Sequence, residues 1–343
     1  MRLEIVGLLA CAAAVGCTKA SDEHARAMEA TRYETGYRTL AAAAPPGDSL
    51  AVLLRFDHLQ EHGLADQVDA LMKIMPDHRR VFGGGGDIAP SFDLVYISTA
   101  EATSATASTL IARSLKPRAE LEAMLAYPNA GVTWSDSPAG RLGGLSPTPW
   151  LEWMDPRAYL IASDPWIVLT NPKNLGAMLE GSPGKQPAWL RAIPSLVTLT
   201  GPDRDSDLLA IASTDDLPAT ARLPGVGQVT MPTSMLAAAT ANGGVVTLSG
   251  DMTFTSEAHA RAAEKALAAL RKQFGAFHAV RDLTVRRKGA ALYWRTTATT
   301  RDVAMMTGLA TNAVRPLFDS GPARGWHYTL PPDAVLDPPG AKP

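Results

Sequence analysis

Two histidines and a glutamate stand close together near the start of an expected helix. His58, Glu61 and His62 form the pattern H-x-x-E-H. On a helix the two imidazoles lie one turn apart and can bind one zinc ion, while the glutamate can polarise a zinc-bound water. The pattern therefore indicates metal-assisted hydrolysis as one candidate chemistry, with Glu61 as the candidate catalytic residue and His58 and His62 as the candidate ligands.

This five-residue motif resembles that of the inverzincin metallopeptidases, such as the pitrilysin-like family. The resemblance implies an α+β domain and a downstream glutamate as third zinc ligand, for which Glu120, Glu122 and Glu152 are the candidates. The residues that flank the motif differ from those of the family, and Gly63 weakens a helix directly after it.

The alternative is that both histidines lie on the surface at a helix start. At about 100° per residue, Glu61 lies about 36° from the centre of the apolar stripe and His62 about 136° away, so His62 is expected to face solvent. We therefore expect neither a metal nor a cofactor, and the zinc peptidase stays the alternative function.

A second candidate site is a group of aromatic residues in a Pro-rich region. Trp150, Trp153 and Trp166 follow Trp134 and lie near Tyr159 in the sequence. Exposed tryptophans stack on sugars or peptides because the ring offers a large rigid area. Trp150, Trp153 and Trp166 are the candidate binding residues, and packing in the core is the alternative.

The first sixteen residues predict a signal peptide. They carry Arg2 and an apolar stretch from Ile5 to Val15, which is too short to span a bilayer permanently. Ala14-Val15-Gly16-Cys17 resembles the lipobox of bacterial lipoproteins, in which the cysteine is lipidated. Leu8-Leu9-Ala10-Cys11 is a second match but leaves an apolar region of only about six residues. A plain secretory signal is the other alternative.

Lipidation of Cys17 implies a location in the cell envelope. In the lipoprotein family a residue other than Asp after the cysteine, here Thr18, implies sorting to the outer membrane of a diderm bacterium. With Cys17 lipidated and Cys11 removed, the mature chain contains no cysteine that could form a disulfide. Several acyl chains on one cysteine hold a protein firmly, whereas a single chain binds only marginally.

The periodicity of apolar residues predicts an α+β fold with two tandem ferredoxin-like (split β-α-β) units, whose antiparallel or mixed sheets are covered by helices on one face. A strand at 49–56, a helix from 57 to about 75, strands at 92–99 and 108–115 and a helix at 117–126 open the first unit. A strand at 245–254, a helix at 256–274 and a hairpin turning at 288–289 repeat that order.

The expected organisation follows in five parts. Residues 1–16 form the signal peptide, residues 17–47 the lipidated N-terminus and tether, residues 48–190 and 191–330 the two units, and residues 331–343 a Pro-rich tail. The layout of residues 48–315 resembles a group of predicted myxobacterial lipoproteins that has no assigned activity.

The charge of the chain is nearly balanced, with 32 Lys and Arg against 34 Asp and Glu among 343 residues. A net charge of −2 gives no bulk attraction to nucleic acid or to an acidic membrane, so the overall charge implies neither partner and no nucleic-acid partner is expected. The sequence therefore favours a non-enzymatic binding or scaffold module, held at the membrane by its lipid, with an envelope protein or a glycan as partner.

Overall fold

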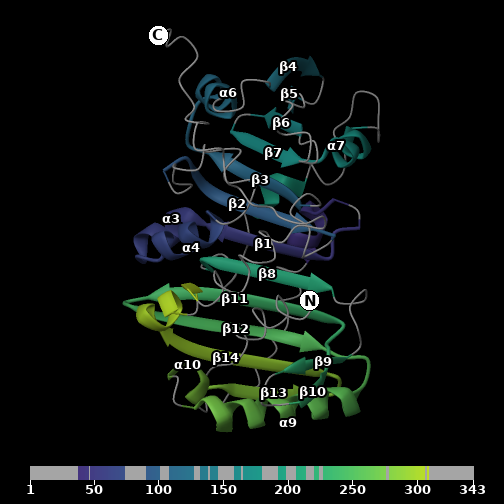
Figure 1. Cartoon of the computed structure of the whole chain (residues 1–343), viewed down its shortest axis with the longest axis vertical. Coiled ribbons are helices and arrows are strands. Elements are labelled where there is room, and N and C mark those ends of the chain that lie inside the picture. Colours follow the sequence, from purple (N-terminus) through teal and green to yellow (C-terminus); the bar gives the residue numbers. More distant parts are fainter. Residues whose placement is uncertain are drawn as a thin grey trace, which may run out of the picture.

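The fold is an α+β arrangement dominated by one large sheet, as a computed structural model of the chain shows (Figure 1). The structure describes residues 38–45, 47–73, 90–100, 108–126, 132–137, 140–145, 158–163, 165–179, 192–197, 206–213, 220–223, 227–275, 278–305 and 307–308. The α+β class predicted from the sequence is confirmed. Within the described ranges no helix is long and apolar enough to cross a membrane.

Twelve strands form the main sheet in the order β13-β14-β12-β11-β8-β1-β2-β3-β7-β6-β5-β4, and every neighbouring pair is antiparallel. The strands are β1 (Leu50–Arg55), β2 (Phe92–Thr99), β3 (Ser108–Ser114), β4 (Val132–Ser137), β5 (Gly140–Leu145), β6 (Ala158–Ser163), β7 (Trp166–Thr170), β8 (Leu208–Ser213), β11 (Ser234–Asn242), β12 (Val245–Thr253), β13 (Thr284–Lys288) and β14 (Ala291–Thr299). A separate hairpin consists of β9 (Thr220–Leu223) and β10 (Gly227–Thr230).

The helices lie outside this sheet. Among the described residues they include α3 (Phe56–Glu61), α4 (Ala65–Met72), α6 (Arg118–Ala126), α7 (Pro172–Leu179), α9 (Glu257–Phe274), α10 (His278–Arg281) and the 3-10 helix η1 (Ile193–Leu196). The helix expected from residue 57 to about 75 is in fact two helices, because the chain turns at Gly63, which adopts a φ of 71° that favours glycine.

The centre of the sheet is the place where the N-terminal and C-terminal halves of the chain meet. β1 pairs with β8 in antiparallel register, from Leu50 opposite Ala212 to Leu54 opposite Leu208. Both strands consist almost entirely of apolar residues, as strands covered on both faces require. The sheet thus runs without interruption across the expected boundary between residues 190 and 191.

Each half contains a hairpin, a helix and a second hairpin. In the C-terminal half, β12 and β13 are joined through α9 and flank β14, so they run parallel with one strand between them. In the N-terminal half, β3 and β6 flank β7 in the same way. Two tandem ferredoxin-like units are nevertheless not confirmed, because both halves share one sheet and β1 lies directly beside β2.

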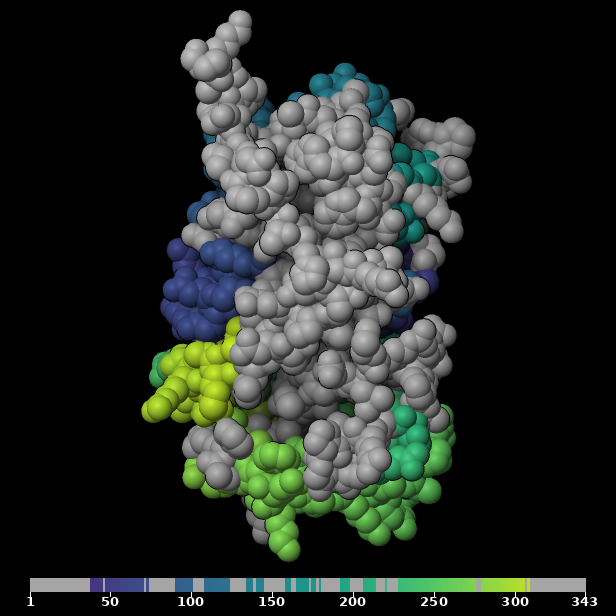
Figure 2. Space-filling model, in the orientation of Figure 1, coloured from purple at the N-terminus to yellow at the C-terminus, as the bar shows by residue number. Residues whose placement is uncertain are grey.

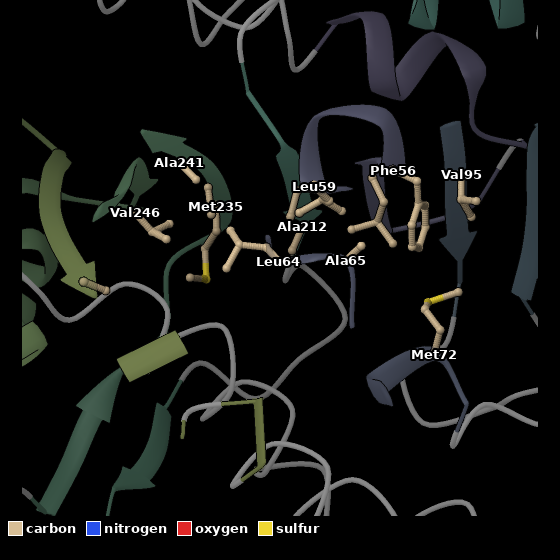
Figure 3. Packing of buried hydrophobic residues seen from close by; sticks show 14 of the residues in the cluster. Phe56, Leu59, Leu64, Ala65, Met72, Val95, Ala212, Met235, Ala241 and Val246 are labelled. Carbon is tan, nitrogen blue, oxygen red and sulfur yellow. The ribbon is translucent and has the colours of Figure 1, made fainter. Parts of the chain in front are cut away.

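The apolar core occupies both faces of the sheet, because side chains alternate along each strand. Leu54 and Ala212 belong to a cluster that includes residues of α3, α4, α6 and α9, and Leu59 of α3 lies beside Ala212 in Figure 3. Leu53 and Ile211 belong to a second cluster, which contains residues of α7 and η1. The expectation of helices on one face only is therefore wrong.

The end of the expected tether packs against the sheet. Residues 38–43 are helical, and Leu40 and Ala43 are fully buried in the second cluster. The hydroxyl of Tyr96, on β2, donates a hydrogen bond to the carbonyl of Leu40 over 2.7 Å. The chain is therefore fixed to the folded body from about Arg38 onward, earlier than the predicted boundary at residue 47.

Candidate functional site

The H-x-x-E-H motif occupies α3 and the turn that follows it. β1 ends at Arg55 and α3 begins at once with Phe56, without a side-chain cap. Asp57 lies in the first turn of α3, and its carboxylate accepts a hydrogen bond from the amide of His58. His62 ends the helix, and the amide of Leu64 donates to the carbonyl of Leu59 over 2.7 Å as the chain turns.

The two histidines converge on a buried aspartate that the sequence did not single out. The Nδ1 atom of His62 lies 2.9 Å from Oδ1 of Asp207, and Nδ1 of His58 lies 3.8 Å from the same oxygen. The Asp207 side chain is 1% exposed, while those of His58 and His62 are 31% and 26% exposed. We refer to His58, His62 and Asp207 as the histidine–aspartate cluster.

Asp207 lies at the start of β8 and is held in place by hydrogen bonds to β1 and β11. It immediately precedes β8, its amide donates to the carbonyl of Ala239 over 2.8 Å, and its own carbonyl accepts from the amide of Arg55 over 2.9 Å. Its Oδ2 accepts a short hydrogen bond from the amide of Ala241. Both carboxylate oxygens are thus used by protein donors, as a buried charge requires.

The direction of the hydrogen bond defines what His62 can do. A carboxylate oxygen only accepts, so the Nδ1–H of His62 donates and the ring is held in one orientation. Such an aspartate orients the base in triad enzymes. Within the described residues, however, no Ser, Thr or Cys side chain is bonded to either ring. The cluster joins α3 to the strands at the centre of the sheet.

The described residues do not complete a zinc site around the motif. The bond from Nδ1 of His62 to Asp207 leaves Nε2 of that ring free, as in histidines that bind zinc, while Glu61 is exposed. In the part of the chain that the structure describes, no three His, Cys, Asp or Glu side chains are arranged to hold a metal ion. The helical projection was wrong for His62, because the chain leaves the helix at that residue and the ring turns toward β8.

The candidate third ligands lie elsewhere. Glu120 and Glu122 are on α6, where Glu120 pairs with Lys116 over 3.6 Å, and Glu122 lies within 3.5 Å of the guanidinium groups of Arg118 and Arg141. Glu152 lies outside the described residues. The glutamates on α6 therefore serve surface ion pairs with nearby cations.

The tryptophans do not form one described surface. Trp166 begins β7 and is only 6% exposed, so its ring packs in the second cluster. The ring of Trp134 contacts that of Tyr159 at a tilt of 37°, with centroids 6.3 Å apart, and it lies so close over Gly143 that a Cβ there would clash. Trp150 and Trp153 lie outside the described residues, as do Cys11 and Cys17, so their assigned roles stay predictions.

The fold and the cluster define an α+β protein with one antiparallel sheet and a buried histidine–aspartate contact at its centre. No protein-family model and no curated protein matches the sequence. Among solved structures, crystal form I of TP0453 is similar, with a TM-score of 0.46 and 9% identity over 78% of this chain and 98% of that chain. Crystal form IV of TP0453 gives a TM-score of 0.42 and 11% identity over 78% and 97% of the two chains.

Proposed function

We propose that the protein is a lipid-anchored component of the cell envelope, held through Cys17 in the outer membrane of a diderm bacterium. Its folded body binds or scaffolds a partner, either an envelope protein or a glycan, and carries out no catalysis. The anchor is supported by the apolar stretch of residues 5–15 and the lipobox that ends at Cys17.

The contact between His62 and Asp207 carries the non-enzymatic part of this proposal. A zinc peptidase needs a third ligand beside the two histidines of its motif, and among the described residues no group of three such side chains is found. His62 instead has a structural partner: its Nδ1–H donates to the Asp207 carboxylate, which also accepts from the amide of Ala241 on β11, while the backbone of Asp207 bonds to Arg55 and Ala239. The motif therefore stabilises the region where the two halves of the chain meet.

The shared layout of the two halves supports an origin by duplication of one α+β unit. The strands β2-β3-β7-β6 and β11-β12-β14-β13 have the same order, each with a helix in the connection between its two hairpins. We interpret β1 and β8 as the equivalent strands through which the two copies joined into one sheet.

The anchor is tested by labelling cells that express the full chain with an alkyne analogue of palmitate. We expect label in the outer-membrane fraction of the wild type and of Cys11→Ala, the matched control, and none in Cys17→Ala. Label that depends on Cys11 would move the anchor to the second lipobox, and unlabelled wild-type protein would refute the anchor.

The role of the body is tested by native mass spectrometry with zinc and by sedimentation with purified sacculi. One zinc per chain, lost in both His58→Ala and His62→Ala, would overturn the non-enzymatic proposal in favour of the peptidase. Sedimentation with sacculi that Trp150→Ala together with Trp153→Ala abolishes would identify the partner as a glycan, and unchanged sedimentation would exclude the tryptophans as the binding residues.

A further inference from the structure

Positive charge is concentrated in one segment of this nearly neutral chain. Residues 257–301 contain ten Lys and Arg against three Asp and Glu, a formal charge of +7, while the rest of the chain contains 22 against 31. The near balance of the whole sequence therefore conceals a local excess of positive charge.

This segment forms one end of the molecule. β13 is the last strand of the sheet, and α9 lies along the same end, below β13 in Figure 1 and at the lower end of the molecule in Figure 2. β4 forms the opposite end of the sheet. We refer to α9, α10, β13, β14 and Arg301 as the basic end.

The cations of the basic end are mostly exposed and outnumber their partners. Arg261 and Arg287 share Glu257, Arg287 also bonds to Glu264, and Arg281 pairs with Asp282. These contacts use all three acidic residues of the segment. Seven exposed cations have no ion pair with a described residue: Lys265, Arg271, Lys272, Arg286, Lys288, Arg295 and Arg301. One of them, Arg271, donates to the carbonyl of Arg281.

The unpaired cations point in more than one direction around the edge of the sheet. On β13, Arg287 turns toward α9, so Arg286 and Lys288 turn to the opposite face of the strand. Lys265 lies on the outward side of α9, in a shallow hollow that Glu257 also lines. This broad array, which includes a carboxylate in its hollow, suits an extended anionic surface better than a single bound anion.

Protection of a sheet edge explains only part of the array. Charged side chains on an edge strand discourage pairing with another chain, and this accounts for the cations of β13. It does not account for Lys265 and Lys272 on α9 or for Arg301 beyond β14, since none of these lies on the edge strand.

The position of the chain relative to its anchor allows this end to reach the membrane. The helical residues 38–43 dock on β2, six strand intervals from β13, or about 29 Å at about 4.8 Å per interval. The 21 residues from Cys17 to Arg38 can span at most about 70 Å. A lipid on Cys17 therefore leaves the basic end free to touch the same bilayer.

We propose that the basic end binds the headgroups of an anionic lipid surface. This rests on the proposed anchor, which keeps the protein at a membrane and raises the local concentration of headgroups. Each Lys or Arg near such a surface adds attraction that strengthens binding about fivefold, and this attraction falls off within a Debye length. The lipid on Cys17 provides attachment, and the basic end orients the body with the edge of its sheet against the bilayer.

The test is a lysine footprint of the full lipidated chain in vesicles. The protein is reconstituted in phosphatidylcholine alone or in phosphatidylcholine with phosphatidylglycerol, and amine acetylation is followed by peptide mass spectrometry. We expect acetylation of Lys265, Lys272 and Lys288 to slow several-fold on the anionic vesicles only, and to recover in about 1 M salt, where the Debye length is about 3 Å. Lys116, which precedes α6, is expected to react equally on both vesicles.

Charge variants sharpen the result. Lys265→Gln with Lys288→Gln removes two cations from the basic end, whereas Lys116→Gln with Arg118→Gln removes two cations near α6. Only the first pair is expected to restore fast acetylation of Lys272 on anionic vesicles. Equal acetylation on both vesicles would overturn the proposal, and equal protection by soluble polyphosphate on neutral vesicles would replace the membrane with a soluble polyanion.

The anchor is scored separately on the same preparation, by the intact mass of the chain. If the chain proves unlipidated, the vesicles are added to it in solution. If the lysines of the basic end are still protected on anionic vesicles, only the proposed anchor is refuted. If the chain is lipidated and these lysines are not protected, only the proposed role of the basic end is refuted.

Discussion

Nδ1 of His62 lies 2.9 Å from Oδ1 of Asp207, a residue 145 positions further along the chain. The contact joins the turn after α3 to the start of β8, and the backbone of Asp207 bonds to Arg55 and Ala239 on either side. It therefore bridges the N-terminal and C-terminal halves where their strands meet. Substitution of Asp207 is accordingly expected to lower the free energy of unfolding.

Asp207→Ala is expected to lower the free energy of unfolding by about 2–4 kcal/mol. The substitution leaves the buried amide of Ala241 without its acceptor and His62 without its partner. Chemical denaturation followed by circular dichroism measures the change. Asp66→Ala, at an exposed position of α4, is the matched control and is expected to change the value by less than about 0.5 kcal/mol.

A double-mutant cycle separates the histidine from the rest of the site. If the bond to Asp207 stabilises the fold, His62→Ala and Asp207→Ala together cost less than the sum of the single changes, by about 1 kcal/mol. Strict additivity would mean that the contact contributes nothing measurable to stability.

Gly250→Ala is expected to destabilise the protein by about 3 kcal/mol. Gly250 lies in a packed strand and not in a turn, and overpacking of such a position usually costs about 1–3 kcal/mol. A Cβ at Gly250 would collide with the backbone carbonyl of Leu236 and the ring of Trp294. Gly144, on β5, has open space around its missing Cβ. Thermal unfolding of Gly250→Ala beside Gly144→Ala tests this, and equal melting temperatures would contradict the packing argument.

Asp251→Asn is expected to remove part of the pH dependence of stability. Burial raises the pKa of Asp251 from 3.8 to about 6. Because the folded state then holds the proton more tightly than the unfolded state, this carboxyl makes stability rise as the pH falls from about 6 toward 4. Between pH 7 and pH 5 its contribution is about 1 kcal/mol.

Urea denaturation at pH 7 and pH 5 checks this expectation. The wild type should gain about 1 kcal/mol more than Asp251→Asn on going to the lower pH. Asp282→Asn, which changes a carboxyl beside Arg281, is the control. An equal gain in wild type and Asp251→Asn would show that Asp251 titrates as an ordinary carboxyl.

Tyr96→Phe is expected to loosen the docking of residues 38–43 at a cost of about 1 kcal/mol, since it deletes the hydrogen bond to the carbonyl of Leu40. Hydrogen exchange of the amides of residues 40–44 should become faster while that of β12 is unchanged. Tyr293→Phe removes a hydroxyl on β14 and serves as the control. Exchange at residues 40–44 that is the same in all three proteins would show that apolar burial alone holds the segment.

Local patterns in the sequence predict much of the secondary structure. The strand expected at 92–99 and the helix expected at 256–274 match β2 and α9 closely, and the hairpin turns at Gly289, whose φ is 59°. These features depend on alternation, helical spacing and turn residues, all of which are local. The first strand of that hairpin, β13, begins at Thr284, after α10 at residues 278–281.

The arrangement of those elements depends on contacts that no local pattern contains. The pairing of β1 with β8 brings together segments more than 150 residues apart, and it turns two expected units into one sheet. Asp207 stands among ordinary loop residues in the sequence, and only the pairing of β8 with β1 and β11 brings it to His62. The basic end was missed for a different reason, since net charge averages over the chain.

The pairing of β1 with β8 also affects how the chain folds and associates with other copies. Separation of the halves would expose two long apolar strands with unpaired backbone groups, which are templates for association with other chains. A second copy carries the same strands, so its β8 could complete the ladder of this chain's β1 by domain exchange. Rapid refolding at high concentration should therefore favour intertwined dimers, and cleavage between residues 180 and 191 should favour aggregation over two soluble fragments.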